Sequence, residues 1–116
     1  MKITHYNKIL PVTMDNEMVN AVAGRVLIGQ EDGAANFCMR FFEMGPGGYT
    51  PKHSHDWEHE VFVHQGNGEV FMDNKWHSLS PGSAIFVPPN VEHQFRNNSE
   101  QVFTFVCLVP PAAPEL

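Results

Sequence analysis

The stretch GGYTPKHSHDWEHEVFVHQG, residues 47–66, decides the fold of this chain together with GSAIFVPPNVEHQFRN, residues 82–97. The first stretch contains His53, His55 and His59, and the second contains His93. His53 and His55 are two residues apart, so on a strand their side chains leave the same face. Imidazole is the commonest metal ligand among side chains, and we expect these four histidines to converge on one metal ion.

The rest of the chain is typical of short strands separated by turns, because nine glycines and nine prolines interrupt it every few residues. We expect about ten strands and little helix, arranged as a sandwich or barrel. The expected strands cover residues 24–28, 37–44, the segment that carries His53 and His55, 59–65, 69–72, 76–79, 83–87, 92–96 and 101–109. Residues 12–23 show a weak helical pattern, and residues 111–116 have no apparent partner and are expected to be mobile.

Both stretches resemble the two sequence motifs of the cupins, small jelly-roll β-barrels with a metal ion inside. The first motif is Gly, five residues, His-x-His, three or four residues, Glu, six residues and Gly. The second is Gly, five residues, Pro-x-Gly, two residues, His, three residues and Asn. The matching positions of this chain are Gly47, His53, His55 and Gly66 for the first motif and Gly82, Pro88, His93 and Asn97 for the second.

Asn90 stands where the second motif has its internal glycine. Asparagine tolerates the left-handed turn conformation better than most residues, so this departure is mild. The resemblance implies an all-β fold, a double-stranded β-helix formed by a single cupin domain over residues 1–116. Motif 1 then lies at 47–66 and motif 2 at 82–97.

The glutamate position of the first motif has two possible alignments. With three residues after His55 it falls on His59, and Gly66 follows six residues later as the motif requires. With four residues it falls on Glu60, and the next glycine position holds Asn67. Adjacent strand residues point to opposite faces, so only one of the two can point inward. The spacing favours His59, and Glu60 stays as the alternative.

The chain also resembles a subgroup of very small cupins in which four histidines hold a manganese ion and the molecules form dimers. That likeness implies His53, His55, His59 and His93 as ligands, manganese or iron as the ion, and a homodimer. Imidazole also suits nickel, copper and zinc, which stay open, whereas all-nitrogen sites disfavour magnesium and calcium. A homodimer would also cover apolar residues near the N-terminus, such as Ile3, Ile9, Leu10 and Val12.

Three further residues are candidate catalytic or pocket residues: Arg40, Phe105 and Cys107. Arg40 interrupts the apolar run FCMRFFEM and is either an anion-binding group facing the cavity or a surface arginine. Phe105 and Cys107 share one face of the last expected strand and would shape an apolar pocket near the metal. For Cys107, a buried structural thiol is the alternative to a reactive one.

Composition limits the partners. The chain has 116 residues, seven Lys and Arg against thirteen Asp and Glu, and a net charge of −6, which argues against nucleic acid and anionic membranes. No run is long and apolar enough for a membrane span or a signal peptide. Two scattered cysteines fit a reduced cytoplasm better than a disulfide framework. We therefore expect a cytoplasmic protein with a small-molecule substrate.

Three functions are compatible with such a site. The first is a metal-dependent oxidoreductase of dioxygenase type, which an all-histidine centre and phenylalanine-rich strands favour. The second is a non-redox isomerase or decarboxylase, for which Arg40 is the single obvious charged pocket residue. The third is a binding or sensing module without turnover, because fold alone does not fix function.

Overall fold

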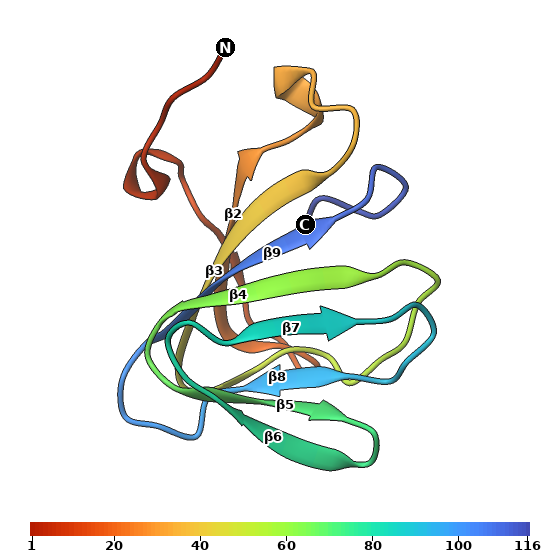
Figure 1. Ribbon diagram of the computed structural model, residues 1–116. Coiled ribbons are helices and arrows are strands. Elements are labelled where there is room, and N and C mark those ends of the chain that lie inside the picture. The colour runs from red at the N-terminus through yellow and green to blue at the C-terminus, as the bar shows by residue number, and fades with distance from the viewer.

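The computed structural model describes residues 1–116 and is built almost entirely of antiparallel strands (Figure 1). Two short 3-10 helices, η1 (Tyr6–Lys8) and η2 (Gln30–Asp32), are the only helical elements. The nine strands are β1 (Val12–Met14), β2 (Asn20–Ile28), β3 (Cys38–Tyr49), β4 (His59–Gln65), β5 (Gly68–Met72), β6 (Lys75–Leu79), β7 (Ala84–Val87), β8 (Gln94–Arg96) and β9 (Phe103–Val109).

The strands form one strongly curled sheet in the order β6-β5-β8-β3-β9-β4-β7, and β2 and β1 continue from β3 as a branch. In Figure 1 the sheet folds over so that β4, β7 and β9 lie across from β5, β6 and β8. The fold is the all-β jelly-roll barrel that the motifs predicted. The expected strands at residues 24–28 and 37–44 form the antiparallel pair β2–β3.

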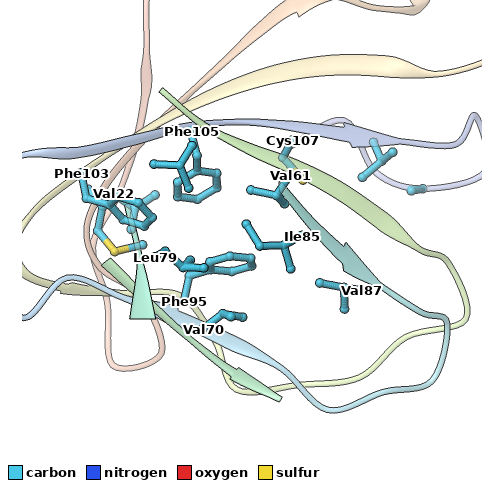
Figure 2. Packing of buried hydrophobic residues seen from close by; sticks show 14 of the residues in the cluster. Val22, Val61, Val70, Leu79, Ile85, Val87, Phe95, Phe103, Phe105 and Cys107 are labelled. Carbon is cyan, nitrogen blue, oxygen red and sulfur yellow. The ribbon is translucent and has the colours of Figure 1, made fainter. Parts of the chain in front are cut away.

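The barrel core is a single apolar cluster between the two halves of the curled sheet. Figure 2 shows Val61, Phe105 and Cys107 on one side pointing toward Phe95 and Val70 on the other. These side chains alternate along their strands with outward residues, as the two-residue period of a strand requires. The alternation fixes which residues of β4 and β9 face the interior.

The helical expectation for residues 12–23 is wrong. Residues 12–14 form β1 and residues 20–23 begin β2, and the two strands pair with each other through Thr13 and Ala23. A turn separates them, in which the side chain of Asn16 accepts hydrogen bonds from the backbone amides of Met18 and Val19. Residues 15–19, which contributed to the helical pattern, therefore belong to a turn between two strands.

The segment around His53 and His55 is not a full strand either. His53 forms an isolated bridge with His93, and β3 ends earlier, at Tyr49. The expectation that residues 111–116 lack a partner is also wrong. Ala113 is buried, and the carboxylate of Glu115 accepts a hydrogen bond from the amide of Gln30 at 2.8 Å. No helix of the structure has both the length and the apolar character that crossing a membrane needs.

Candidate metal centre

The two histidine-bearing motifs lie side by side, antiparallel, over their whole length. At one end the amide of Gly47 donates to the carbonyl of Asn97 at 2.9 Å, so the first residue of motif 1 meets the last of motif 2. In the middle, His53 and His93 exchange both backbone hydrogen bonds, at 3.1 and 2.9 Å. Further along, β4 pairs with β7. This pairing brings residues that are forty positions apart in the sequence onto one site.

A turn in motif 2 fixes the backbone of motif 1 at His55. Asn90 has a φ of 65°, so the asparagine that replaces the expected glycine adopts the left-handed conformation. Its amide donates to the carbonyl of His55 at 2.6 Å. The prediction that asparagine would serve this turn is therefore confirmed.

Three of the four predicted ligands form a compact cluster. The nitrogens that His53, His55 and His93 can offer to a metal lie within 4.8 Å of one another. His59 is not part of this compact group, but its Nε2 lies 2.9 Å from Nε2 of His55. The rings of His59 and His93 are 5.3 Å apart. All four imidazoles therefore surround one small volume, and three of them form its tightest part.

Backbone carbonyls orient two of the imidazoles. Nδ1 of His55 lies 2.8 Å from the carbonyl of Trp57, and Nδ1 of His93 lies 2.8 Å from the carbonyl of Val91. A carbonyl only accepts, so in each ring Nδ1 carries the proton and Nε2 keeps a free lone pair. Such a contact commonly fixes the tautomer of a metal-binding histidine. Trp57 also stacks on the His55 ring, with centroids 4.1 Å apart.

The electrostatics of the cluster favour neutral imidazoles, the form that binds metals. Burial, and then repulsion from neighbouring His93 and His55, lower the pKa of His53. Burial lowers the pKa of His93, and burial together with the Arg40 charge lowers that of His59 to about 3. Several neutral nitrogen donors around one point fit a divalent transition metal, so the residues present suit the ion that the fold predicts.

Arg40 and Cys107 form a second polar group in contact with His59. Nη2 of Arg40 donates to Sγ of Cys107 at 2.9 Å and lies 3.4 Å from Nδ1 of His59. The sulfur is 3.3 Å from the same Nδ1. Burial raises the pKa of the Cys107 thiol, and the nearby guanidinium only partly offsets that effect. Cys107 is therefore a thiol at neutral pH.

The histidine cluster lies in the wall of a cavity of about 500 Å³. Its wall is formed mainly by apolar and aromatic side chains, and its charged or titratable side chains are the four histidines, Arg40 and Cys107. The lining residues are Met14, Val19, Val22, Arg40, Phe42, Thr50, Pro51, His53, Ser54, His55, Trp57, His59, His93, Phe95, Phe105, Cys107, Pro114 and Leu116. No Asp or Glu lines it. A pocket of this size and character suits a small organic molecule.

The structure decides the orientations that the sequence left open. His59 is buried and points inward, whereas Glu60 is exposed on the outer face, where a hydrogen bond to Glu58 favours its protonated form and raises its pKa to about 7. Arg40 faces the cavity and is only 8% exposed. Phe105 and Cys107 also line the cavity. The ligand and catalytic roles assigned to these residues stay predictions.

Sequence reasoning missed part of the cavity wall. Met14, Val19 and Val22 come from the region expected to be helical. The available signal was the spacing of Val12 and Met14, which are two residues apart as on one face of a strand. Pro114 and Leu116 come from the segment expected to lack a partner, and no pattern in the sequence marks them. These residues add apolar surface to the cavity wall.

Residues 40–109 match the family described as Cupin domain. The match covers more than half of the chain and includes both motifs, so the protein belongs to the cupin family.

Among solved structures, the chain is similar to the polyketide cyclase RemF from Streptomyces resistomycificus. The TM-score is 0.92 and the identity 31%, over 98% of this chain and 82% of that one. The predicted oxalate decarboxylase from Thermotoga maritima is 17% identical with a TM-score of 0.84, over 94% of this chain and 98% of that one, which shows the common fold alone.

Two curated relatives match shorter regions. The 1-methylthio-D-xylulose 5-phosphate methylsulfurylase of Rhodospirillum rubrum is 30% identical over 71 residues, 61% of this chain and 46% of the relative. The polyketide synthase CurC of Streptomyces cyaneus is 30% identical over 84 residues, 72% of this chain and 54% of the relative. The matched part of the chain therefore spans about half the length of these relatives.

Proposed function

We propose that the protein is a metal-dependent cyclase that acts on an enolisable aromatic or polyketide-type substrate. The observation that carries the proposal is the aromatic-walled cavity of about 500 Å³ with the histidine cluster in its wall. The similarity to a polyketide cyclase over 98% of the chain supports the same substrate class.

The reaction we infer is an intramolecular aldol condensation. It forms one carbon–carbon bond, releases one molecule of water and needs no oxidant. When bound, a divalent transition metal would supply Lewis acidity toward a carbonyl or enol oxygen of the substrate. Manganese or iron follows from the resemblance of the motifs, and zinc, nickel and copper suit the same donors.

The side chains of the cavity have separate tasks in this proposal. His53, His55, His59 and His93 hold the ion, and the carbonyls of Trp57 and Val91 orient two of these rings. Phe42 and Phe105, stacked with ring centroids 5.5 Å apart, hold the hydrocarbon part of the substrate and exclude water. No Asp or Glu side chain lines the cavity and its four imidazoles hold the ion, so proton transfer there falls to water or to the Cys107 thiol.

The dioxygenase expected from the sequence is the second candidate. It is favoured by the all-imidazole donor set, which leaves the charge of a divalent ion uncompensated and suits iron as well as zinc. Both candidates begin with an enolic substrate oxygen at the histidine cluster. They differ in whether oxygen is consumed.

The test uses protein loaded separately with zinc, manganese and iron, and a phenyl-substituted linear triketone as probe. We expect the loaded protein to speed exchange of the probe's acidic C–H protons with deuterium and to release a cyclised phenol under anaerobic conditions. Oxygen uptake matched to loss of the probe would establish the dioxygenase instead. Binding of the probe without exchange or product would contradict both enzyme proposals and leave a binding module.

Since both cysteines are free, we place this activity in the reducing cytoplasm.

A further inference from the structure

Arg40 is a buried cation without an anionic partner. Its side chain is 8% exposed, and its Nε has no hydrogen-bond partner. The three ion pairs of the protein, Lys2–Asp32, Arg25–Glu43 and Arg96–Glu69, do not involve it. Its only close polar contacts are the Cys107 thiol and Nδ1 of His59.

The acidic residues nearest to it along the strands are engaged elsewhere. Glu43, three residues further along β3, points to the outer face and pairs with Arg25. Glu60, next to His59 on β4, is exposed and interacts with Glu58. No Asp or Glu side chain lines the cavity, and none forms an ion pair with the guanidinium.

Such an arrangement is costly for the folded protein. A buried charge without a partner destabilises the folded state, and an apolar side chain of similar volume is commonly as stable or more stable. The guanidinium borders a cavity large enough for an organic molecule. The anion that would offset its charge therefore has to come from the cavity's ligand.

The pairing of β3 with β9 gives the cavity a polar end and an aromatic end. Arg40 is directly opposite Cys107, and Phe42, the next inward residue of β3, is opposite Phe105. The guanidinium carbon lies 4.9 Å from the centre of the Phe42 ring. Phe95 stacks on Phe105 with centroids 5.2 Å apart. A flat aromatic ligand lying on these rings would present a substituent at its edge to Arg40.

We propose that Arg40 forms an anion-binding subsite for the acidic oxygen group of an aromatic ligand, a carboxylate or an ionised enol or phenol. The proposal rests on the proposed function in placing that ligand in the same cavity, and it requires neither a bound ion nor turnover. A free Nε–H and the Nη groups form the planar donor set that recognises paired oxygens. The subsite would select anionic substrates over neutral ones and orient their rings toward the phenylalanines.

The test measures binding of naphthalene carboxylate and of its neutral carboxamide to chelator-treated, metal-free protein at pH 8 by calorimetry. No lysine and no second arginine lines the cavity, so Arg40 is its one permanently charged side chain. We expect the carboxylate to bind about tenfold or more tightly than the carboxamide, as a charge-assisted hydrogen bond predicts. Arg40→Met should remove the preference, and Arg40→Lys should retain part of it.

Arg96→Met is the matched control, because Arg96 stacks on Trp76 at 3.6 Å, pairs with Glu69 and lies outside the cavity. It should leave the carboxylate preference unchanged. Equal binding of the two probes to the unmodified protein, or an undiminished preference in Arg40→Met, would overturn the proposal. Because these assays contain no metal and follow no reaction, a failed triketone assay would overturn the proposed cyclase and leave this result standing.

Discussion

Arg40 on β3 and Cys107 on β9 occupy opposite positions of one antiparallel ladder, and Nη2 of the arginine lies 2.9 Å from the sulfur of the cysteine. Neither residue belongs to the two histidine motifs. The motifs build one wall of the cavity, and the β3–β9 ladder supplies the polar group behind His59 in another. The chemistry of the site therefore depends on strands that carry no motif of their own.

Gly66 and Gly82 allow a test of why the motifs contain these glycines. Both have positive φ, 77° and 93°. A Cβ at Gly66 would overlap the carbonyl oxygen of Val102, whereas a Cβ at Gly82 would meet nothing within 4 Å. In urea unfolding, Gly82→Ala should cost about 1 to 2 kcal/mol from backbone strain. Gly66→Ala should cost about 3 kcal/mol or more, because steric overlap is added. Equal losses would contradict this account.

Asn97, the last residue of motif 2, has a structural role in this account. It is fully buried, and its amide donates to the carbonyls of Met44 and Gln101 while its oxygen accepts from Ser99. Asn97→Ala should destabilise the protein by about 2 to 4 kcal/mol, because it leaves buried polar groups without partners. The exposed neighbour provides the control, and Asn98→Ala should cost less than about 1 kcal/mol. A loss of metal binding in Asn97→Ala with unchanged stability would refute the structural role.

The buried imidazoles should make the metal-free protein sensitive to acid. The folded pKa of His59 is about 3, below its ordinary value of 6.5, so between these values the unfolded chain binds a proton that the folded chain does not. The stability from His59 is complete above pH 6.5 and falls as the pH falls, by at most about 1.4 kcal/mol per pH unit. Urea unfolding at pH 7.5 and 5.5 measures this change.

His59→Gln is the control for that experiment, because it removes one titrating group and should flatten the pH dependence. Glu60 works in the opposite direction, since its pKa is raised to about 7, but its exposure to solvent weakens the effect. The difference between the unmodified protein and His59→Gln isolates the histidine. An unmodified protein that is as stable at pH 5.5 as at 7.5, with no such difference, would contradict the argument.

We propose that the chain forms a homodimer through its N-terminal region. Ile3, Leu10 and Val12 are 87%, 90% and 50% exposed, and β1 pairs only with β2. Light scattering at micromolar concentration should give twice the chain mass of 13.1 kDa. Val12→Asp should shift the protein toward monomer, and Val102→Asp, at a side chain also 50% exposed, should not. A monomeric mass for the unmodified protein would contradict the dimer.

Much of the fold and of the histidine cluster could be predicted because motif spacing fixes strand register. The interval from His55 to Gly66 indicated that His59 points inward, and in the structure His59 is buried on the inner face of β4. The orientation of Arg40 could not be predicted, because both faces of residues 37–44 carry large apolar side chains. Only the pairing with β9, more than sixty residues away, fixes that face. The turn at Asn16 and the contacts of residues 113–116 depend likewise on tertiary packing.

The most direct test of the account is the metal content of chelator-stripped protein after exposure to zinc, manganese or iron. We predict one ion per chain, lost in His53→Ala, His55→Ala and His93→Ala. In His59→Ala, which removes the ligand outside the compact cluster, we predict weaker binding rather than its loss. His64 contacts the Phe41 ring edge-to-face outside the cavity, so the control variant His64→Ala should retain full uptake. No uptake by the unmodified protein, or full uptake by the three alanine variants of the compact cluster, would contradict the metal centre.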